Sequence, residues 1–392
     1  MTKRASAASE PARTERGQGA PASERVGGFA GAEPPDLIVD CHLDLSMNAL
    51  DWNRDLSQAL ADIRDREAGK TDKPDRGRGT VSFGEMRAGR IGVCVATQIA
   101  RYVAPGNTLP GWHSPEQAWA QTQGQSAWYR AMEERGELAP ILTRQDLSRV
   151  VGQWTAGQMP SRLPIGYVLS LEGADSILTL RHLEQAYGHG LRALGPAHYG
   201  PGRYAWGTET VGPFPPEGRE LLREMDRLGL ILDVTHLTDE EFWEALEVYQ
   251  GPIWASHSDC RALAPHQRQL SDEQIKALVD RCAIIGAALD AWMLVPNWIR
   301  QQTTPESAGV TLETVVDHID RVCQIAGSAR HAMIGSDLDG GFGREQSPKD
   351  LETIADLSRL PSLLRARGYS ADDARAIAQG NALRFLEAAL PE

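Results

Sequence analysis

Eight short runs of aliphatic and β-branched residues recur along the chain, and they constrain its fold more than any other feature. Most of the runs are apolar on both faces, which is typical of strands in a parallel sheet that is covered on both sides. Segments with helical signals separate them. The runs lie at residues 37–40, 91–97, 165–171, 191–194, 230–234, 252–256, 283–289 and 332–336.

The segments between the runs carry the signals that begin helices. Three of them open with Ser or Thr followed three residues later by Glu, Gln or Asp, and they start at Thr238, Ser271 and Ser370. Residues 217–227 place their apolar side chains on one helical face. Strand followed by helix, eight times over, predicts a (β/α)8 barrel of the TIM type. A doubly wound open sheet is the alternative, and eight runs in roughly 350 residues favour the barrel.

Composition sets the domain limits and excludes some partners. Residues 1–35 are rich in Ala, Gly, Ser, Pro, Arg and Glu without apolar periodicity, which predicts a disordered leader. Residues 36–392 are then expected to form a single barrel domain. With 40 basic and 53 acidic residues, the net charge is −13, which argues against nucleic-acid binding because that needs a basic surface.

The cysteines and the hydropathy pattern bear on where in the cell the protein is located. The five cysteines form no CxxC pair and are odd in number, so neither a disulfide framework nor a cysteine-based zinc site is indicated. The sequence shows no signal peptide and no run of 18 apolar residues. We therefore expect a cytoplasmic protein without a membrane span.

Two stretches interrupt the strand–helix rhythm. Residues 51–85 and 101–135 follow the first and second apolar runs and are interpreted as inserted elaborations. The second stretch holds Trp112, Trp119 and Trp128. Aromatic residues at such spacing belong more often to a packed core than to a lid, so we expect these three to pack an inserted helix.

Six polar residues lie at the carboxyl ends of predicted strands. Taken singly, such residues are more often explained by a local hydrogen bond, a helix cap or a salt bridge. In a (β/α)8 barrel, however, these strand ends converge on the mouth where active sites form. Carboxylates crowded there repel one another unless cations relieve them, and imidazole plus carboxylate ligands suit zinc, with manganese, iron or cobalt as alternatives. The six are His42, Asp44, Glu172, His236, His257 and Asp337.

The motifs around these positions resemble those of a known family. From about Asp36 to Leu390, their order and spacing are similar to those of the membrane dipeptidase (renal dipeptidase) family of the amidohydrolase superfamily. The motifs that carry the resemblance are DCHLD, LSLEGAD, LGPAHYG, DVTHLTDEEF, PIWASHSDCRALAPHQRQLSD, IGSDLDGG and GNALRFLE.

The resemblance implies a metal-binding role for five positions. His42 and Asp44 would bind one divalent ion, His236 and His257 would bind a second, and Glu172 would bridge the two. Two ions so held would share a hydroxide of lowered pKa that attacks an amide carbonyl. Zinc is the expected metal, and the expected function is a zinc-dependent dipeptidase acting on small dipeptides.

Three further roles follow from the same resemblance. Asp337 would be the acid or base that handles the proton of the attacking water, and His198 would polarise the scissile carbonyl. Arg268 would hold the free carboxylate of the substrate, a task that suits its bidentate guanidinium. The family also implies a homodimer, although no surface pattern in the sequence indicates one.

The sequence departs from the family on the substrate side. The run HYGPGRYAWGT places Gly200 to Arg203 where the family has an Asn, and Gln269 stands where Asn is common. These changes leave open a related amidohydrolase acting on another small amide, lactam or modified peptide. A metal-binding scaffold without catalysis is a third alternative, and the presence of Asp337, His198 and Arg268 argues against it.

Overall fold

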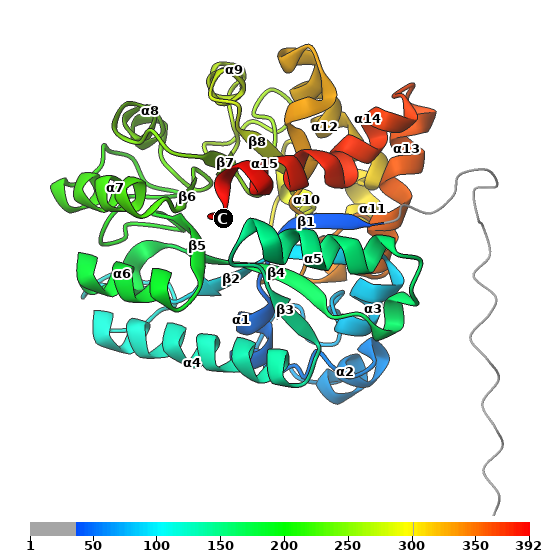
Figure 1. Ribbon diagram of the computed structural model, residues 1–392, viewed down its shortest axis with the longest axis horizontal. Coiled ribbons are helices and arrows are strands. Elements are labelled where there is room, and N and C mark those ends of the chain that lie inside the picture. Colours follow the sequence, from blue (N-terminus) through cyan, green and yellow to red (C-terminus); the bar gives the residue numbers. More distant parts are fainter. Residues whose placement is uncertain (1–36, 301) are drawn as a thin grey trace, which may run out of the picture. The chain divides into compact units, whose positions relative to one another are not determined.

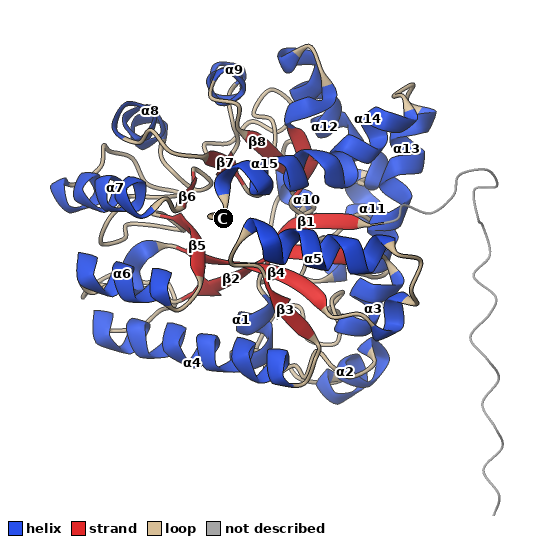
Figure 2. Ribbon diagram, in the orientation of Figure 1, coloured by secondary structure: helices blue, strands red, loops and turns tan. Residues whose placement is uncertain are grey.

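A closed barrel of parallel strands forms the centre of the protein. The computed structural model describes residues 37–300 and 302–392, and the predicted leader at residues 1–35 lies outside them. Within the described residues, helices surround the strands (Figures 1 and 2). The barrel strands are β1 (Ile38–Leu43), β2 (Ile91–Ile99), β4 (Ile165–Glu172), β5 (Leu191–Gly195), β6 (Ile231–Asp233), β7 (Ile253–Ala255), β8 (Ile284–Ala287) and β9 (Ala332–Ile334).

Strand pairing closes the barrel and confirms the predicted fold. β1 pairs with β9 on one side and with β2 on the other, and β2 pairs in turn with β4. From β4 to β9 each strand pairs with the next along the chain, always in parallel. All eight predicted runs form strands. The closure excludes the doubly wound open sheet, which would leave two free edges.

One short strand was not predicted. β3 (Leu138–Pro140) pairs with the first residues of β4, beginning with Leu138 opposite Ile165. β5 takes the same edge of β4 further along, from Leu169 onward. A three-residue strand that ends in proline lacks both the length and the pattern that mark the other strands.

The helices begin where the sequence predicts them. α8 and α9 both open with a complete capping box, at Thr238 and Ser271. The Ser370 segment forms α14 and α15 with a π-helical turn at Ala376–Gly380 between them. The helices are α1 (Leu45–Leu50), α2 (Leu60–Glu67), α3 (Phe83–Ala88), α4 (Pro115–Glu134), α5 (Arg144–Thr155), α6 (Leu180–Gly188), α7 (Pro216–Leu228), α8 (Asp239–Val248), α9 (Asp272–Asp280), α10 (Ala291–Leu294), α11 (Pro305–Ala308), α12 (Leu312–Ala326), α13 (Leu360–Ala366), α14 (Ala371–Arg375) and α15 (Asn381–Ala389). None of the helices in the described ranges is long and apolar enough to cross a bilayer.

The insertion at residues 51–85 is tied to the loop after β9 by buried charges. The Arg54 guanidinium donates hydrogen bonds to the carboxylates of Glu67 and Asp75, and it lies 3.6 Å from Asp339 Oδ2. Asp339 also accepts hydrogen bonds from the backbone N–H and the hydroxyl of Thr80. Because buried charges are costly unless they are paired and hydrogen-bonded, this network fixes the loop that begins two residues earlier, at Asp337.

The insertion at residues 101–135 contains the long helix α4. Trp119 and Trp128 lie on α4 and pack, partly buried, against the core. The core-packing prediction is therefore confirmed for these two residues. Trp112 precedes the helix, remains 37% exposed and lines a cavity, so for this residue the prediction was wrong.

Candidate metal centre and active site

The six predicted residues come together at the mouth of the barrel. Each belongs to the carboxyl end of a strand or to the loop that follows it, which is the position from which side chains converge in this fold. His42 lies within β1, Asp44 directly after it, and Glu172 is the last residue of β4. His236, His257 and Asp337 lie in the turns after β6, β7 and β9.

Glu172 lies between the histidines of this group. Its Oε2 atom is 3.6 Å from His42 Nε2, while its Oε1 atom is 3.2 Å from His236 Nε2 and 3.5 Å from His257 Nε2. The two oxygens of one buried carboxylate therefore face two different groups of nitrogen atoms. This is the arrangement that a carboxylate bridging two ions requires.

Two sets of possible ligands follow from these distances. His42, Asp44 and Glu172 bring one ligand atom each to within 4.8 Å of one another, and so do Glu172, His236 and His257. His42 Nε2 is buried and has no hydrogen-bond partner. A buried polar atom without a partner is costly, and imidazole with carboxylate donors suits zinc-type ions. The residues present therefore fit divalent metal.

A third set contains Asp233, which the sequence analysis did not single out. Asp233 has a ligand atom within 4.8 Å of His42 and His257. Its Oδ1 atom, however, already accepts the backbone N–H groups of Thr235 and Ser256. Asp233 therefore supports the turns that carry the histidines. Its signal in the sequence is the one that drew attention to Glu172, an acid in a buried strand.

Ser256 contacts one histidine of each ligand set. Its hydroxyl lies 3.2 Å from His42 Nδ1 and 2.9 Å from His257 Nδ1. These contacts occupy the Nδ1 atoms and turn both Nε2 atoms toward Glu172. Partners of this kind orient histidine ligands and tune their basicity.

Two more of the candidate ligands, His236 and Asp44, have separate hydroxyl partners. Thr208 Oγ1 lies 2.8 Å from His236 Nδ1, and the Thr97 hydroxyl donates to Asp44 Oδ1. Sequence reasoning missed both threonines. Thr97 lies near the end of β2, whereas Thr208 lies in the loop after β5, and no spacing rule connects either residue to its ligand.

Two of the site residues adopt left-handed backbone conformations. His236 has φ = 70° and Asp337 has φ = 56°. Residues with a Cβ adopt this region rarely, and such strain tends to gather at functional sites. Both residues lie three residues beyond the end of a short strand, in the turns after β6 and β9.

Burial and charges in the site shift the pKa values of His42 and His236 in opposite directions. Burial opposes protonation of His42, but the carboxylates of Glu172, Asp44 and Asp337 raise its pKa to about 10. Burial lowers the pKa of His236 to about 3, and the positive charge of Arg268 adds to this shift. Without metal, His42 therefore carries a proton near neutral pH, whereas His236 is neutral.

Burial and neighbouring charges shift the pKa values of Asp337 and His198 away from their usual ranges. Burial, together with the charges of Asp44 and Glu172, raises the pKa of Asp337 well above its usual range, although His42 opposes the shift. Burial lowers the pKa of His198 well below its usual value. The His198 imidazole is therefore neutral, and its Nε2 atom lies 4.0 Å from Glu172 Oε1.

Arg268 and His198 line a small cavity together with several of the candidate ligands. The cavity has a volume of about 50 Å³, and Tyr199 and Asp290 also contribute to its wall. Arg268 donates to the backbone carbonyl of His257 at 2.7 Å and to the hydroxyl of Ser258 at 3.2 Å. These bonds hold its guanidinium beside the second ligand set.

A second cavity of about 380 Å³ adjoins the first. The two share Asp44, His198 and Gly340, and Trp112 lies in the wall of the larger one. The site thus has a narrow part at the ligands and a wider part toward the insertions.

The unusual loop after His198 turns away from both cavities. Arg203 donates hydrogen bonds to the backbone carbonyls of Asp175 and Ile177, and it is not part of either cavity wall. The loop then returns so that the backbone N–H of Thr208 donates to the carbonyl of His198 at 2.9 Å. Residues 200–203 therefore line neither cavity.

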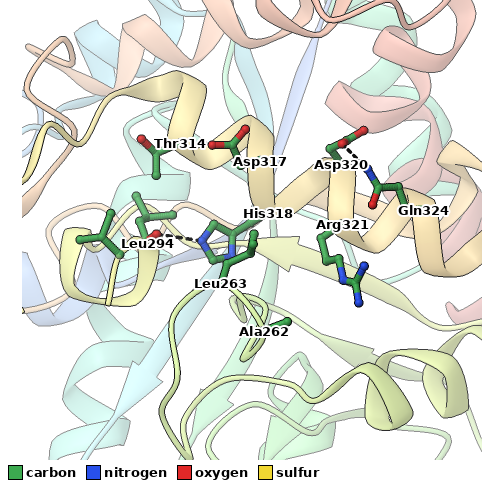
Figure 3. A pocket seen from close by; sticks show the side chains of 10 residues that line it. Ala262, Leu263, Leu294, Thr314, Asp317, His318, Asp320, Arg321 and Gln324 are labelled. Carbon is green, nitrogen blue, oxygen red and sulfur yellow. Dashed lines mark hydrogen bonds between the residues drawn. The ribbon is translucent and has the colours of Figure 1, made fainter. Parts of the chain in front are cut away.

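A larger groove of about 590 Å³ lies elsewhere, beside α12 (Figure 3). Its histidine, His318, accepts the backbone N–H of Cys260 at Nδ1, and its Nε2 atom lies 3.0 Å from the carbonyl of Leu294. Because both ring nitrogens already have backbone partners, this histidine is structural. The groove contains none of the six site residues.

Comparisons with known proteins agree with the site. Residues 36–390 match the family described as membrane dipeptidase (peptidase family M19). A protein from the pqqA 5′ region of Klebsiella pneumoniae is 32% identical over 197 residues, covering 48% of this chain and 69% of that protein. Dipeptidase tcpJ of Claviceps purpurea is 30% identical over 232 residues, covering 56% and 51%. The match thus spans about half the length of this fungal relative.

Solved structures share the fold over most of the chain. The crystal structure of dipeptidase AC, a metallo peptidase of family M19, superposes with a TM-score of 0.71 at 22% identity, covering 91% of this chain and 99% of that one. A metallo peptidase from Rhodobacter sphaeroides, liganded with a phosphinate mimic of the dipeptide L-Ala-D-Ala, gives 0.70 at 22% identity with the same coverage. With the family match extending over residues 36–390, the chain belongs to the membrane dipeptidase family, peptidase family M19.

Proposed function

We propose that this protein is a zinc-dependent dipeptidase with two metal ions. The observation that carries the proposal is the position of Glu172, whose two oxygens face His42 on one side and His236 and His257 on the other. His42 and Asp44 would hold one ion and His236 and His257 the other, with Glu172 shared. When bound, the pair of ions supplies a water of lowered pKa as the nucleophile.

The remaining roles belong to side chains of the chain itself. Asp337, whose pKa is raised by burial, takes a proton from the attacking water and returns it to the leaving amine. His198 donates a hydrogen bond from Nε2 to the carbonyl oxygen as negative charge develops there. Arg268 binds the terminal carboxylate of the substrate through two parallel hydrogen bonds.

The shape of the site supports a small peptide substrate. The narrow cavity at the ligands has room for little more than the scissile amide, and Arg268 limits it on one side. The wider cavity, of about 380 Å³, leaves space for the rest of a small peptide. A dipeptide with a D-residue at its C-terminus is a reasonable first substrate, since the similar Rhodobacter sphaeroides enzyme was solved with a mimic of L-Ala-D-Ala.

A dipeptide panel assayed with and without chelator tests the proposal. We expect turnover of at least one dipeptide, its loss on metal removal, and its return when zinc is added. An N-acetylated and C-amidated version of the best substrate is the matched control, because it lacks the carboxylate that Arg268 binds. The assignment is lost if no dipeptide shows chelator-sensitive hydrolysis.

The two alternatives from the sequence are considered separately. Another small amide as substrate was suggested by the loop at residues 200–203, but Arg203 is bonded to backbone carbonyls and no contact of this loop favours that alternative. A scaffold without catalysis is tested by Asp337→Asn. We expect this variant to retain its metal and to lose turnover by about 100- to 10,000-fold. Full activity in this variant would contradict the proton-transfer role.

A further inference from the structure

Arg101 lies directly behind His198, on the side away from the ligands. Its Nη2 atom is 2.5 Å from His198 Nδ1. The arginine follows the end of β2, whereas the histidine follows β5, so the contact joins two loops that are distant in sequence. Sequence reasoning did not single out Arg101.

The chemistry of the two groups leaves one hydrogen-bonding arrangement. A guanidinium has only N–H donors and stays charged in proteins. His198 Nδ1 must therefore offer its lone pair as the acceptor, which places the ring proton of the neutral imidazole on Nε2. The opposite tautomer would direct the Nδ1–H at a donor.

Other contacts hold the arginine in this position. Arg101 Nη1 donates to the carbonyl of Pro110 at 2.8 Å, and the Arg101 carbonyl accepts the backbone N–H of Trp112 at the same distance. The next residue, Tyr102, donates its backbone N–H to buried Asp175 at 3.0 Å. Hydrogen bonds of both the main chain and the side chain thus hold Arg101 in place.

The other ring nitrogen of His198, Nε2, faces the candidate metal centre. This atom lies 4.0 Å from Glu172 Oε1, and the residue lines both cavities. We propose that Arg101 is a positioning residue that holds His198 in the Nε2–H tautomer and orientation needed to donate to the substrate carbonyl. This inference rests on the role of His198 in the proposed function.

Direct binding of substrate by Arg101 is the competing explanation. Arg101 lines the wider cavity, and its Nε atom has no hydrogen-bond partner. An arginine that grips substrate would act mainly on KM and independently of His198. A positioning residue would act on kcat and only while His198 is present.

Nitrogen-15 NMR of the histidine ring tests the contact without any assay of activity. The His198 signals are assigned by their loss in His198→Gln, and spectra are recorded for the full chain with and without zinc. We expect Nδ1 to be an unprotonated acceptor and Nε2 to carry the proton. A proton on His198 Nδ1 overturns the proposal, and this holds even if no dipeptide is ever hydrolysed.

A double-variant cycle then tests the functional consequence. Arg101→Met is expected to lower kcat by about 10- to 100-fold with little change in KM, and to cause no further loss in a His198→Ala background. Arg203→Met is the matched control, because it removes a nearby arginine that does not contact His198, and it should keep kcat near the wild-type value. Independent losses in the double variant, or an effect of Arg101→Met on KM alone, would overturn the proposal.

Discussion

The two candidate ligand sets share Glu172 but differ in charge and in origin. The set of His42 and Asp44 has two carboxylates with one imidazole, and its own two residues come from one strand end. The set of His236 and His257 has one carboxylate with two imidazoles, drawn from separate turns after β6 and β7. The pKa of His42 is raised to about 10 and that of His236 is lowered to about 3. The difference teaches what each ion must overcome: the additional carboxylate of the first set predicts the stronger cation site, but an ion can bind there only after it displaces the proton on His42.

The largest expected effect comes from the shared residue. Glu172→Gln keeps the size of the side chain but removes the charge that both sets use. We expect both ions to be lost on dialysis and turnover to fall by roughly 1000-fold, equivalent to about 4 kcal/mol of transition-state stabilisation. Metal analysis of the dialysed variant measures this directly. Two retained ions would remove Glu172 from the bridging role.

Variants of the separate ligands distinguish the two sets. His236→Ala is expected to leave one tightly bound ion per chain, whereas Asp44→Ala should lose the tight site. Turnover should fall strongly in both, because the proposed nucleophile needs both ions. Calorimetric titration of the metal-free variants gives the number and strength of the sites. Equal affinities in the two variants would contradict the electrostatic difference between the sets.

The hydroxyl partners should produce a smaller and selective effect. Thr208→Val removes the partner of His236, and Thr97→Val removes the partner of Asp44. Each is expected to weaken its own ion by about 10- to 100-fold and to leave the other unchanged. The two variants serve as controls for each other. Weakening of both ions by either change would mean that the sets are not independent.

The smallest predicted effect is the release of a proton when the first ion binds. In the metal-free protein the pKa of His42 is about 10, so His42 is protonated at pH 7 and must lose that proton before it can bind metal. Affinity for the first ion should therefore rise with pH up to about pH 10 and level off above it. Calorimetry in buffers of different ionisation enthalpy should show release of about one proton per first ion. No proton release at pH 7 would show that His42 is not a ligand.

The barrel could be predicted because its strands are apolar on both faces, and the six site residues could be predicted because each ends such a strand. The short strand β3 was missed since it has no pattern of its own. Thr97, Thr208 and Arg101 were missed for a different reason. Their partners lie in other loops, and only closure of the barrel brings them together. The homodimer and the cytoplasmic location stay predictions.

The two ligand sets also differ in whether local sequence or closure of the barrel brings their residues together. His42 and Asp44 lie two residues apart at one strand end, so their convergence follows from the alternation of side chains along a strand. His42 Nε2 lies 3.9 Å from Asp44 Oδ1, on the shared side that this alternation predicts. His236 and His257 converge only because β6 and β7 are neighbours in the sheet.

Turnover of a dipeptide measured against added zinc tests the central claim most directly. The metal-free protein is titrated with zinc while bound metal and hydrolysis are recorded in the same samples. The account predicts little activity at one equivalent per chain and a rise to full activity as the second equivalent binds. Full activity at one equivalent would contradict the two-ion centre, and two bound equivalents without hydrolysis of any dipeptide would contradict the proposed function.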